Sequence, residues 1–391
     1  MAEKKYLLAF DGQAAESDFY DNVTSVTVEE NTDVASTARL RLAIQVLDDG
    51  SWTMLDDDRL SLFRRLTVSI GVGSGGASGS MVTVFDGYVT GVEVTAASTP
   101  GSSFVDVVAF DTSVLLSLEE KIATWPNMSD SDIINQILGS YGVQAQVDTT
   151  SPVHQDNDTT VVQRSTDIQF ARELASRNGL ELYFTTDDTG QVTAMCCAPQ
   201  LSGSPQPDLA IRFGGQSNLR SFAVRVSGRR PLHVKAAQID VKSNSATTAQ
   251  ADDVSLAKLG DKDLETLAGG TLDGLVTPAD AQAQMLILGP PTSDATELQA
   301  HAQAVRDEAG WFITAEGEIN ADAYGAVLRP HRLVLVKGAG TLYSGTYYVT
   351  RVVHRLQSDG SYAQTFEARR NARDLDGTEQ FGQSAAAAQG M

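Results

Sequence analysis

Two segments near the C-terminus decide the fold: Gly345-Thr-Tyr-Tyr-Val-Thr-Arg-Val-Val-His354 and Tyr362-Ala-Gln-Thr-Phe-Glu-Ala-Arg369. The polar run from Gln357 to Ser361 separates them. In the first segment two sets of residues alternate, which is the period of a β-strand with two different faces. The pattern predicts a β-hairpin with large side chains on both faces, so we expect another layer or a partner to cover it.

The composition is that of a folded, acidic protein. With 391 residues, 42% hydrophobic and 20% charged, the chain can bury a large core and divide into two or three domains. Its net charge of -21 argues against nucleic-acid binding, which depends on clustered Lys and Arg, and against anionic membranes. Apolar runs stay well below the ~20 residues of a membrane span.

Neither the N-terminus nor the cysteines point to export. The apolar run in Met1–Phe10 is too short for a signal peptide and is better interpreted as a first β-strand. Cys196 and Cys197 are adjacent, so they cannot link distant segments and are expected to be reduced strand residues. We therefore expect synthesis and folding in the cytoplasm.

Residues 1–125 are predicted to form an all-β domain. Segments rich in Val, Leu, Ile, Phe and Thr recur at short spacing, with polar or glycine turns between them. The predicted strands are 23–28, 38–46, 66–72, 81–94 and 104–110. This spacing favours a small barrel or sandwich.

A compact α/β insert is predicted for residues 126–207. Ser129 and the acids after it are typical of a helix start, and apolar residues then recur at helical spacing up to Gly142. A second helix begins with the capping-box pattern Thr166-Asp-Ile-Gln169 and ends at Asn178-Gly179. Strands at 180–184 and 191–196 and a linker at 201–207 complete the insert.

A second, discontinuous barrel is predicted for residues 208–242 and 293–375. Between these parts, residues 243–292 are polar, Ala-rich and acidic, which predicts an excursion with a short helix near 278–285. Another helix is expected at 293–309, and the tail 376–391 is expected to be disordered.

No motif predicts catalysis or ligand binding. Gly71-Val-Gly-Ser-Gly-Gly76 matches GxGxxG, but a strand pattern follows where a dinucleotide site needs a helix. Asp56-Asp-Asp58 lacks the spaced oxygen ligands of a calcium loop. No zinc-motif spacing links the histidines, which are His154, His233, His301, His331 and His354. We predict no catalytic, cofactor-binding or metal-binding residues, and no enzyme.

Three stretches carry a resemblance to a known family. They are the helix–strand unit Thr166–Phe184, the segment Ile211–Phe222 and the closing hairpin Gly345–Arg369; Val84–Gly91 fits more loosely. In order and spacing they resemble the phage late control D proteins. These belong to the baseplate hubs of contractile tails and contractile injection systems, which include the hub part of type VI secretion spikes. The resemblance covers most of residues 1–375 and leaves 243–292 unmatched.

The resemblance implies a β-rich α+β fold, with two tail-tube-like β-barrel domains and the α/β insert between them. It implies a structural virion component without a cofactor: a homotrimer that acts as a symmetry adapter and continues the central channel. Its partners would be a hexameric tail tube protein, a trimeric spike protein and baseplate or wedge proteins, within a phage tail baseplate or injection particle.

The sequence departs from some relatives of this kind. It lacks a repetitive β-helical spike after the hub part and a recognisable lysozyme insertion, so a separate spike protein is expected. Two alternatives stay open: a cell-wall hydrolase carried at the tail tip, and a β-rich carbohydrate-binding or adhesin protein. The pattern does not distinguish a phage from a tailocin or an injection system.

Overall fold

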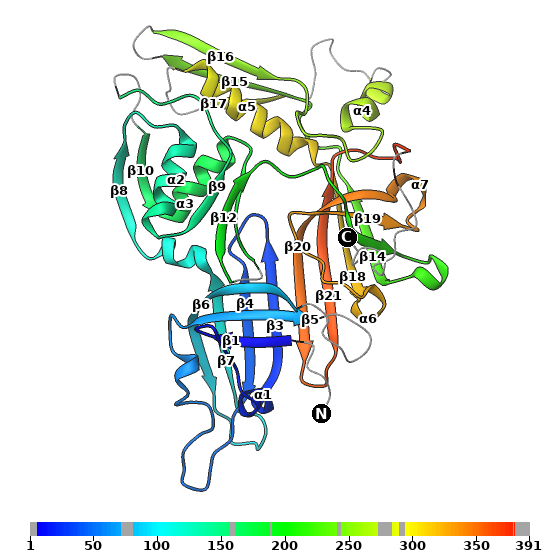
Figure 1. The fold of residues 1–391 in the computed structure, drawn as a ribbon. Helices are drawn as coiled ribbons and strands as arrows, with labels where there is room; N and C mark the ends of the chain where they lie inside the picture. The colour runs from blue at the N-terminus through cyan, green and yellow to red at the C-terminus, as the bar shows by residue number, and fades with distance from the viewer. Residues whose placement is uncertain are drawn as a thin grey trace.

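A computed structural model describes residues 6–71, 81–156, 161–187, 190–240, 244–272, 284–288, 294–377 and 379. Most strands lie in one 13-stranded, largely antiparallel sheet, to which an insert and a smaller sheet are attached (Figure 1). The predicted β-rich α+β class is confirmed. Within the described residues, no helix combines the length and the apolar character that a membrane span needs.

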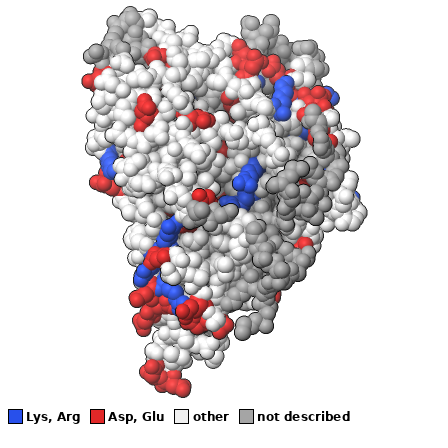
Figure 2. All heavy atoms as spheres, in the orientation of Figure 1, with Lys and Arg blue, Asp and Glu red and all other residues white. Residues whose placement is uncertain are grey.

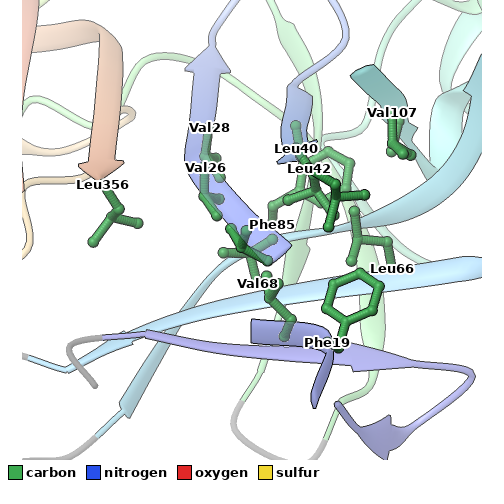
Figure 3. Close-up of a cluster of buried hydrophobic side chains, with 14 of the residues drawn as sticks. Phe19, Val26, Val28, Leu40, Leu42, Leu66, Val68, Phe85, Val107 and Leu356 are labelled. Carbon is green, nitrogen blue, oxygen red and sulfur yellow. The ribbon is translucent and has the colours of Figure 1, made fainter. Parts of the chain in front are cut away.

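The first unit of the large sheet has the strand order β3-β4-β7-β6-β5-β1. Alternate residues such as Leu40 and Leu42 on β4 are fully buried, and they pack in one core with Phe19 and Phe85 (Figure 3). The elements are β1 (Tyr6–Phe10), β2 (Gln13–Ala14), α1 (Ser17–Asn22), β3 (Val23–Asn31), β4 (Thr37–Ala43), η1 (Asp58–Leu60), β5 (Arg65–Gly71), β6 (Met81–Thr95) and β7 (Phe104–Asp111).

The insert contains two helices that pack against short sheets. Both helices begin where the sequence predicts: Ser129 forms a capping box with Asp132, and the Thr166 side chain accepts a hydrogen bond from the Gln169 N–H. Strand β8 pairs with β10, and β9, β12 and β11 form a second sheet. The elements are η2 (Thr112–Ser117), β8 (Glu120–Trp125), α2 (Asp130–Ser140), β9 (Gln144–Val147), β10 (Val161–Thr166), α3 (Asp167–Arg177), β11 (Glu181–Thr186) and β12 (Val192–Cys197).

The second unit contains the predicted closing hairpin, which is confirmed as β20 and β21. The side chains of Tyr348, Val349, Val352 and Val353 are all buried. A β-bulge between Val349 and Arg351 interrupts the strict alternation of faces that the sequence suggests. The elements are β13 (Gln206–Ala210), η3 (Gly214–Gln216), β14 (Leu219–Val226), β18 (Ile313–Asn320), α6 (Ala321–Tyr324), β19 (Leu333–Lys337), α7 (Gly340–Tyr343), β20 (Gly345–Gln357) and β21 (Tyr362–Arg370).

A separate three-stranded sheet, covered by helix α5 (Ala295–Gly310), lies beside the insert (Figure 1). It is formed by β15 (His233–Asp240), β16 (Ser245–Ala251) and β17 (Gln284–Leu288), and α4 (Leu264–Leu272) lies between β16 and β17 in the chain. Alternate apolar residues of β15, including Val234 and Ala236, pack against Leu298 and Ala302 of α5.

This sheet differs from the sequence-based expectation in two ways. Residues 208–242 do not stay together in the second barrel, because β15 pairs with β16 from the expected polar excursion. The helix expected near 278–285 lies mostly outside the described residues, and its last two positions, Gln284 and Met285, begin strand β17. Of the tail expected to be disordered, only residues 376, 377 and 379 are described.

The two units of the large sheet repeat one strand order. In chain order, the second unit is β13, β14, β18, β19, β20 and β21, and these strands lie as β14-β18-β21-β20-β19-β13. Within its own unit each strand therefore has the same neighbours as its counterpart, although β13 runs parallel to β19 whereas β1 runs antiparallel to β5. Bulges recur at matching places, between Val89 and Gly91 in β6 and between Val349 and Arg351 in β20. The fold is a tandem repeat of one strand arrangement.

Neither unit closes into a barrel through the strand pairings of the described residues. In the first unit the edge of β3 pairs with β20 of the second unit, in antiparallel register from Asn31 opposite Arg351 to Ser25 opposite Gln357. Because β4 occupies one edge of β3 and β20 occupies nearly the whole of the other, over Ser25–Asn31, β3 cannot also close its own unit. The predicted pair of closed barrels is thus observed as two open units in a continuous sheet.

A glycine pair in β6 provides a test of the packing between strands. A Cβ at Gly87 would lie 2.0 Å from the Phe110 carbonyl oxygen, whereas a Cβ at Gly91 would meet nothing closer than 4.0 Å. We expect Gly87→Ala to lower the free energy of unfolding by more than about 2 kcal/mol and Gly91→Ala to change it by less than about 1 kcal/mol. Urea denaturation of both variants checks this, and equal losses would contradict it.

Candidate functional site

The described residues point to junctions between units rather than to a catalytic pocket. Three buried carboxylates, Glu30, Asp130 and Glu181, each contact one histidine and one arginine. Each cluster takes its members from elements far apart in the sequence. We call these three groups the junction clusters.

The Glu30 cluster joins the first unit to the second. Glu30 of β3 lies 3.0 Å from His354 Nε2 of β20 and accepts a 2.9 Å hydrogen bond from Arg329 Nε. His354 Nδ1 lies 2.9 Å from the Tyr362 hydroxyl, and Arg329 also donates to the Thr83 carbonyl of β6. Burial alone would raise the pKa of Glu30, but Arg329 and His354 reverse that effect and lower it. The carboxylate is therefore held ionised at the contact between the two units.

The Glu181 cluster joins the insert to the second unit. Glu181 of β11 accepts hydrogen bonds from Arg369 (2.7 Å) and from the Tyr348 hydroxyl (2.5 Å), and it lies 3.2 Å from His331 Nδ1. The Arg369 guanidinium also stacks 4.3 Å above the Trp311 ring. Burial opposes ionisation, yet His331 and Arg369 lower the pKa of Glu181. The insert is thus attached to the two closing strands through one ionised side chain.

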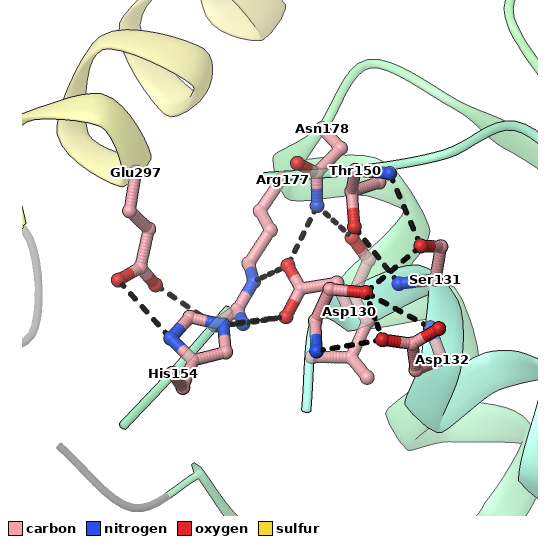
Figure 4. A network of polar contacts seen from close by, with 10 residues as sticks. Asp130, Ser131, Asp132, Thr150, His154, Arg177, Asn178 and Glu297 are labelled. Carbon is pink, nitrogen blue, oxygen red and sulfur yellow. Dashed lines mark hydrogen bonds and ion pairs between the residues drawn. The ribbon is translucent and has the colours of Figure 1, made fainter. Parts of the chain in front are cut away.

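The Asp130 cluster fastens the two insert helices to each other and to α5 (Figure 4). Asp130, in the first turn of α2, accepts hydrogen bonds from Arg177 Nε (2.6 Å) and Asn178 (2.7 Å) at the end of α3. His154 Nε2 lies 3.0 Å from the same carboxylate. Glu297 of α5 approaches His154 (3.8 Å) and Arg177 (3.4 Å) from the other side. Burial would raise the pKa of Asp130, but His154 and Arg177 lower it to about 2.

The junction clusters mainly fix the relative positions of the elements that they join. Desolvation cancels much of the attraction within a buried ion pair, so such a pair adds little net stability over an apolar contact. Removing one partner, however, leaves an uncompensated buried charge that costs several kcal/mol. The clusters therefore penalise any arrangement in which the units or the insert shift relative to one another.

A cavity of about 800 Å³ lies between the insert, α5 and the second unit. Its lining carries both signs of charge, including Arg172, Arg369, Asp33 and Glu308. This mixture of charges does not select one class of small molecule, and the Arg369 side chain already belongs to the Glu181 cluster.

The residues considered as possible ligands or catalytic groups in the sequence take part in structural contacts. His154, His331 and His354 belong to the junction clusters, and His354 is a strand residue as expected. Within the described ranges, no group of three or more His, Cys, Asp or Glu side chains could hold a metal ion. Asp57 caps η1 and binds Arg59. The predicted glycine loop falls mainly on residues 72–80, outside the described residues.

The two cysteines are free and buried in β12. Burial raises the pKa of Cys196 to about 12, so its thiol stays protonated at neutral pH. This agrees with the expectation that they are reduced strand residues.

Acidic side chains gather on part of the surface. Figure 2 shows Asp and Glu clustered at the lower end of one face, over the first unit, with a few Lys and Arg side chains beside them. This excess of acidic side chains agrees with the net charge of -21.

One family model, described as the Alg8 N-terminal domain, matches residues 5–358. The match spans the first unit, the insert and the second unit as far as the end of β20. The chain belongs to this family. No curated protein matches the sequence of this Alg8 N-terminal domain family member.

Solved structures of tail proteins share the fold over nearly the whole chain. A 43 kDa tail protein of prophage MuSo2 from Shewanella oneidensis has a TM-score of 0.62 at 14% identity, covering 95% of this chain and 100% of that one. A tail protein from Neisseria meningitidis MC58 has a TM-score of 0.63 at 11% identity, with 94% and 96% covered. The resemblance found in the sequence is thus confirmed for the fold.

A third structure with this fold comes from a secretion system. The Escherichia coli c3393 protein, described as a type VI secretion component similar to the T4 bacteriophage tail proteins gp27 and gp5, has a TM-score of 0.54 at 13% identity. The alignment covers 96% of this family member and 78% of that chain. The same fold therefore occurs in a phage tail and in a secretion component.

Removing the cation of one junction cluster tests its role. Arg329→Met leaves Glu30 buried without its guanidinium, so we expect the free energy of unfolding to fall by about 3–5 kcal/mol. The combined change Glu30→Gln and Arg329→Met should recover much of this loss, because no buried charge remains. Arg355→Ala, at an exposed position of β20 next to His354, is the control and should lie within about 0.5 kcal/mol of wild type. Urea denaturation of the four proteins decides the matter.

The lowered carboxylate pKa values predict acid sensitivity. Because the folded pKa of Asp130 is about 2 and its ordinary value is 3.8, its stabilisation is complete above about pH 4 and is lost as the pH falls toward 2. This shift corresponds to about 2 kcal/mol. In Asp130→Asn, the free energy of unfolding should be lower at neutral pH but fall less steeply over this range. Asp48→Asn, at an exposed turn, should keep the wild-type slope.

Proposed function

We propose that this chain is the structural hub of a contractile tail or injection system. In this role a trimer joins a hexameric tail tube to a trimeric spike and continues the central channel. The observation that carries the proposal is the tandem repeat, in which two units of the same strand order lie edge to edge in one chain.

The repeat gives the chain the symmetry that such an adapter needs. Three chains with two units each present six equivalent strand arrangements, so one face can meet a six-fold partner while the chain itself stays three-fold. Each open unit corresponds to one tail-tube-like domain, with the insert from η2 to β12 between them. The parts of the chain outside the two units occur three times in such a trimer, so they can contact a three-fold spike.

The rigid junctions agree with a mechanical role. A component that transmits force between a tube and a spike must keep its units in fixed relation, and the junction clusters penalise displacement at each contact. The shared fold with tail proteins and with a type VI secretion component supports the same class of function. Baseplate or wedge proteins are the expected further partners.

The oligomer tests this proposal. Native mass spectrometry and negative-stain electron microscopy of the purified chain, alone and with its tube protein, should show a three-fold ring with six lobes. A monomer that forms no ring under either condition would overturn the proposal. Turnover of purified peptidoglycan by the chain would instead support the cell-wall hydrolase alternative.

A further inference from the structure

Strand β20 uses one of its edges for two different partners. Its first residues, Gly345 to Tyr348, pair with β19, and its later residues, Arg351 to Gln357, pair with β3 of the other unit. At the change of partner, Val349 exchanges hydrogen bonds with His331 and Arg332, just before β19. The second half of this edge is what joins the two units within the chain.

Strand β6 is the counterpart of β20 and pairs in the same way along its first half, but in the part of the chain that the structure describes the partner that corresponds to β3 is missing. Met81 to Tyr88 pair with β5, and Val89 then exchanges hydrogen bonds with Phe63 and Arg64, just before β5. Phe63 and His331 even share a left-handed backbone, at φ 63° and 59°. Beyond this point, no strand among the described residues pairs with Thr90–Thr95 on this edge. The part of the edge that pairs with β3 in β20 is therefore unpaired in β6.

The counterpart of β3 is β14, the terminal strand of the large sheet. Both strands pair with the next strand of their unit through a bulge at the same place, Val23/Ser25 in β3 and Leu219/Ser221 in β14. The other edge of β14 meets no strand among the described residues. In Figure 1 β6 and β14 lie on opposite sides of the molecule, so one chain cannot bring these two open edges together.

We propose that β14 of one copy pairs in antiparallel register with the open edge of β6 in the next copy. Transferring the register of β3 and β20 places Val226 opposite Val92, Arg225 opposite Glu93 and Val224 opposite Val94. This inference rests on the proposed ring and specifies its interface. Three such contacts, alternating with the three contacts inside the chains, continue one sheet around the ring.

The apolar side chains of the two edges fit this register. Val92, Val94 and Val226 are exposed by 39%, 48% and 44% although each lies on a strand of the large sheet. Val92 and Val94 border a groove of about 290 Å³ whose other walls include Leu55 and Leu62. A valine opposite Val92 would fill the mouth of this groove and remove apolar surface from water.

The charged side chains fit it as well. Glu93 lies directly opposite Asp106 across β6 and β7, and Arg41 of β4 binds Asp106 through hydrogen bonds of 2.8 and 2.7 Å. Two carboxylates side by side repel each other. Arg225, exposed on β14, would place a second guanidinium at the outer side of this row, next to Glu93.

The same comparison explains why a wrong pairing is disfavoured. Within the chain, the positions equivalent to Val226 and Val94 are Glu30 and His354, which form a buried ion pair. If β3 of one copy paired with β6 of another, Glu29 would lie opposite Glu93, and Glu30 would be buried among valines without its cation. The ionic contact inside the chain and the apolar contact between chains are thus not interchangeable.

Cysteine cross-linking tests the register. The double variant Val92→Cys with Val226→Cys, oxidised as the assembled full-length protein, should give disulfide-linked dimers and trimers on a non-reducing gel. Each single variant, and the mismatched pair Val92→Cys with Arg220→Cys, should give none, because the buried Cys196 and Cys197 do not react. A trimer in which only the mismatched pair cross-links, or neither pair does, overturns the inference.

Charge exchange provides a second measurement that does not depend on disulfide geometry. Glu93→Arg and Arg225→Glu should each weaken trimer formation on the order of tenfold by sedimentation, and the double variant should recover most of it. If wild type forms the three-fold ring but neither single change affects it, this inference fails and the proposed function stands. If wild type never forms a ring, alone or with its tube protein, the proposed function fails as well.

Discussion

The unpaired edge of a β-strand is the constraint on which this structure depends. Exposed backbone N–H and C=O groups on an edge invite another strand, so a sheet must either close on itself or define its neighbour. Here the first unit meets the second through β3 and β20 instead of closing. The place of the Glu30 cluster and the open edges of β6 and β14 follow from that one pairing.

Local elements were readable from the sequence because their signals are local. The closing hairpin, the two capped helices of the insert and most first-unit strands carry period-two or helical patterns with recognisable turn or cap residues. The errors arise where the pattern of a strand does not specify which strand it pairs with. Strand β15 looks like its neighbour β14, yet it pairs with β16 and β17, and nothing in residues 233–240 specifies that choice.

The junction clusters could not have been derived from the sequence. Glu30 and His354 are 324 residues apart, and a single Glu and a single His in strand patterns give no sign that they meet. The tandem repeat, by contrast, did leave a signal. Tyr88-Val-Thr-Gly-Val92 and Tyr348-Val-Thr-Arg-Val352 share four of five residues at matching places in β6 and β20. Internal similarity of this kind is detectable in the amino-acid sequence alone.

Keeping two units in one polypeptide lets equivalent positions diverge. Six separate copies of a unit would have to carry the same loops, whereas here one unit is followed by the helical insert and the other is interrupted by β15 to α5. In a ring of the proposed kind, first and second units would alternate. They would share the same strand arrangement but differ in the segments attached to it. Because both units belong to one polypeptide, every such ring contains them in equal number. One unit cannot take the place of the other.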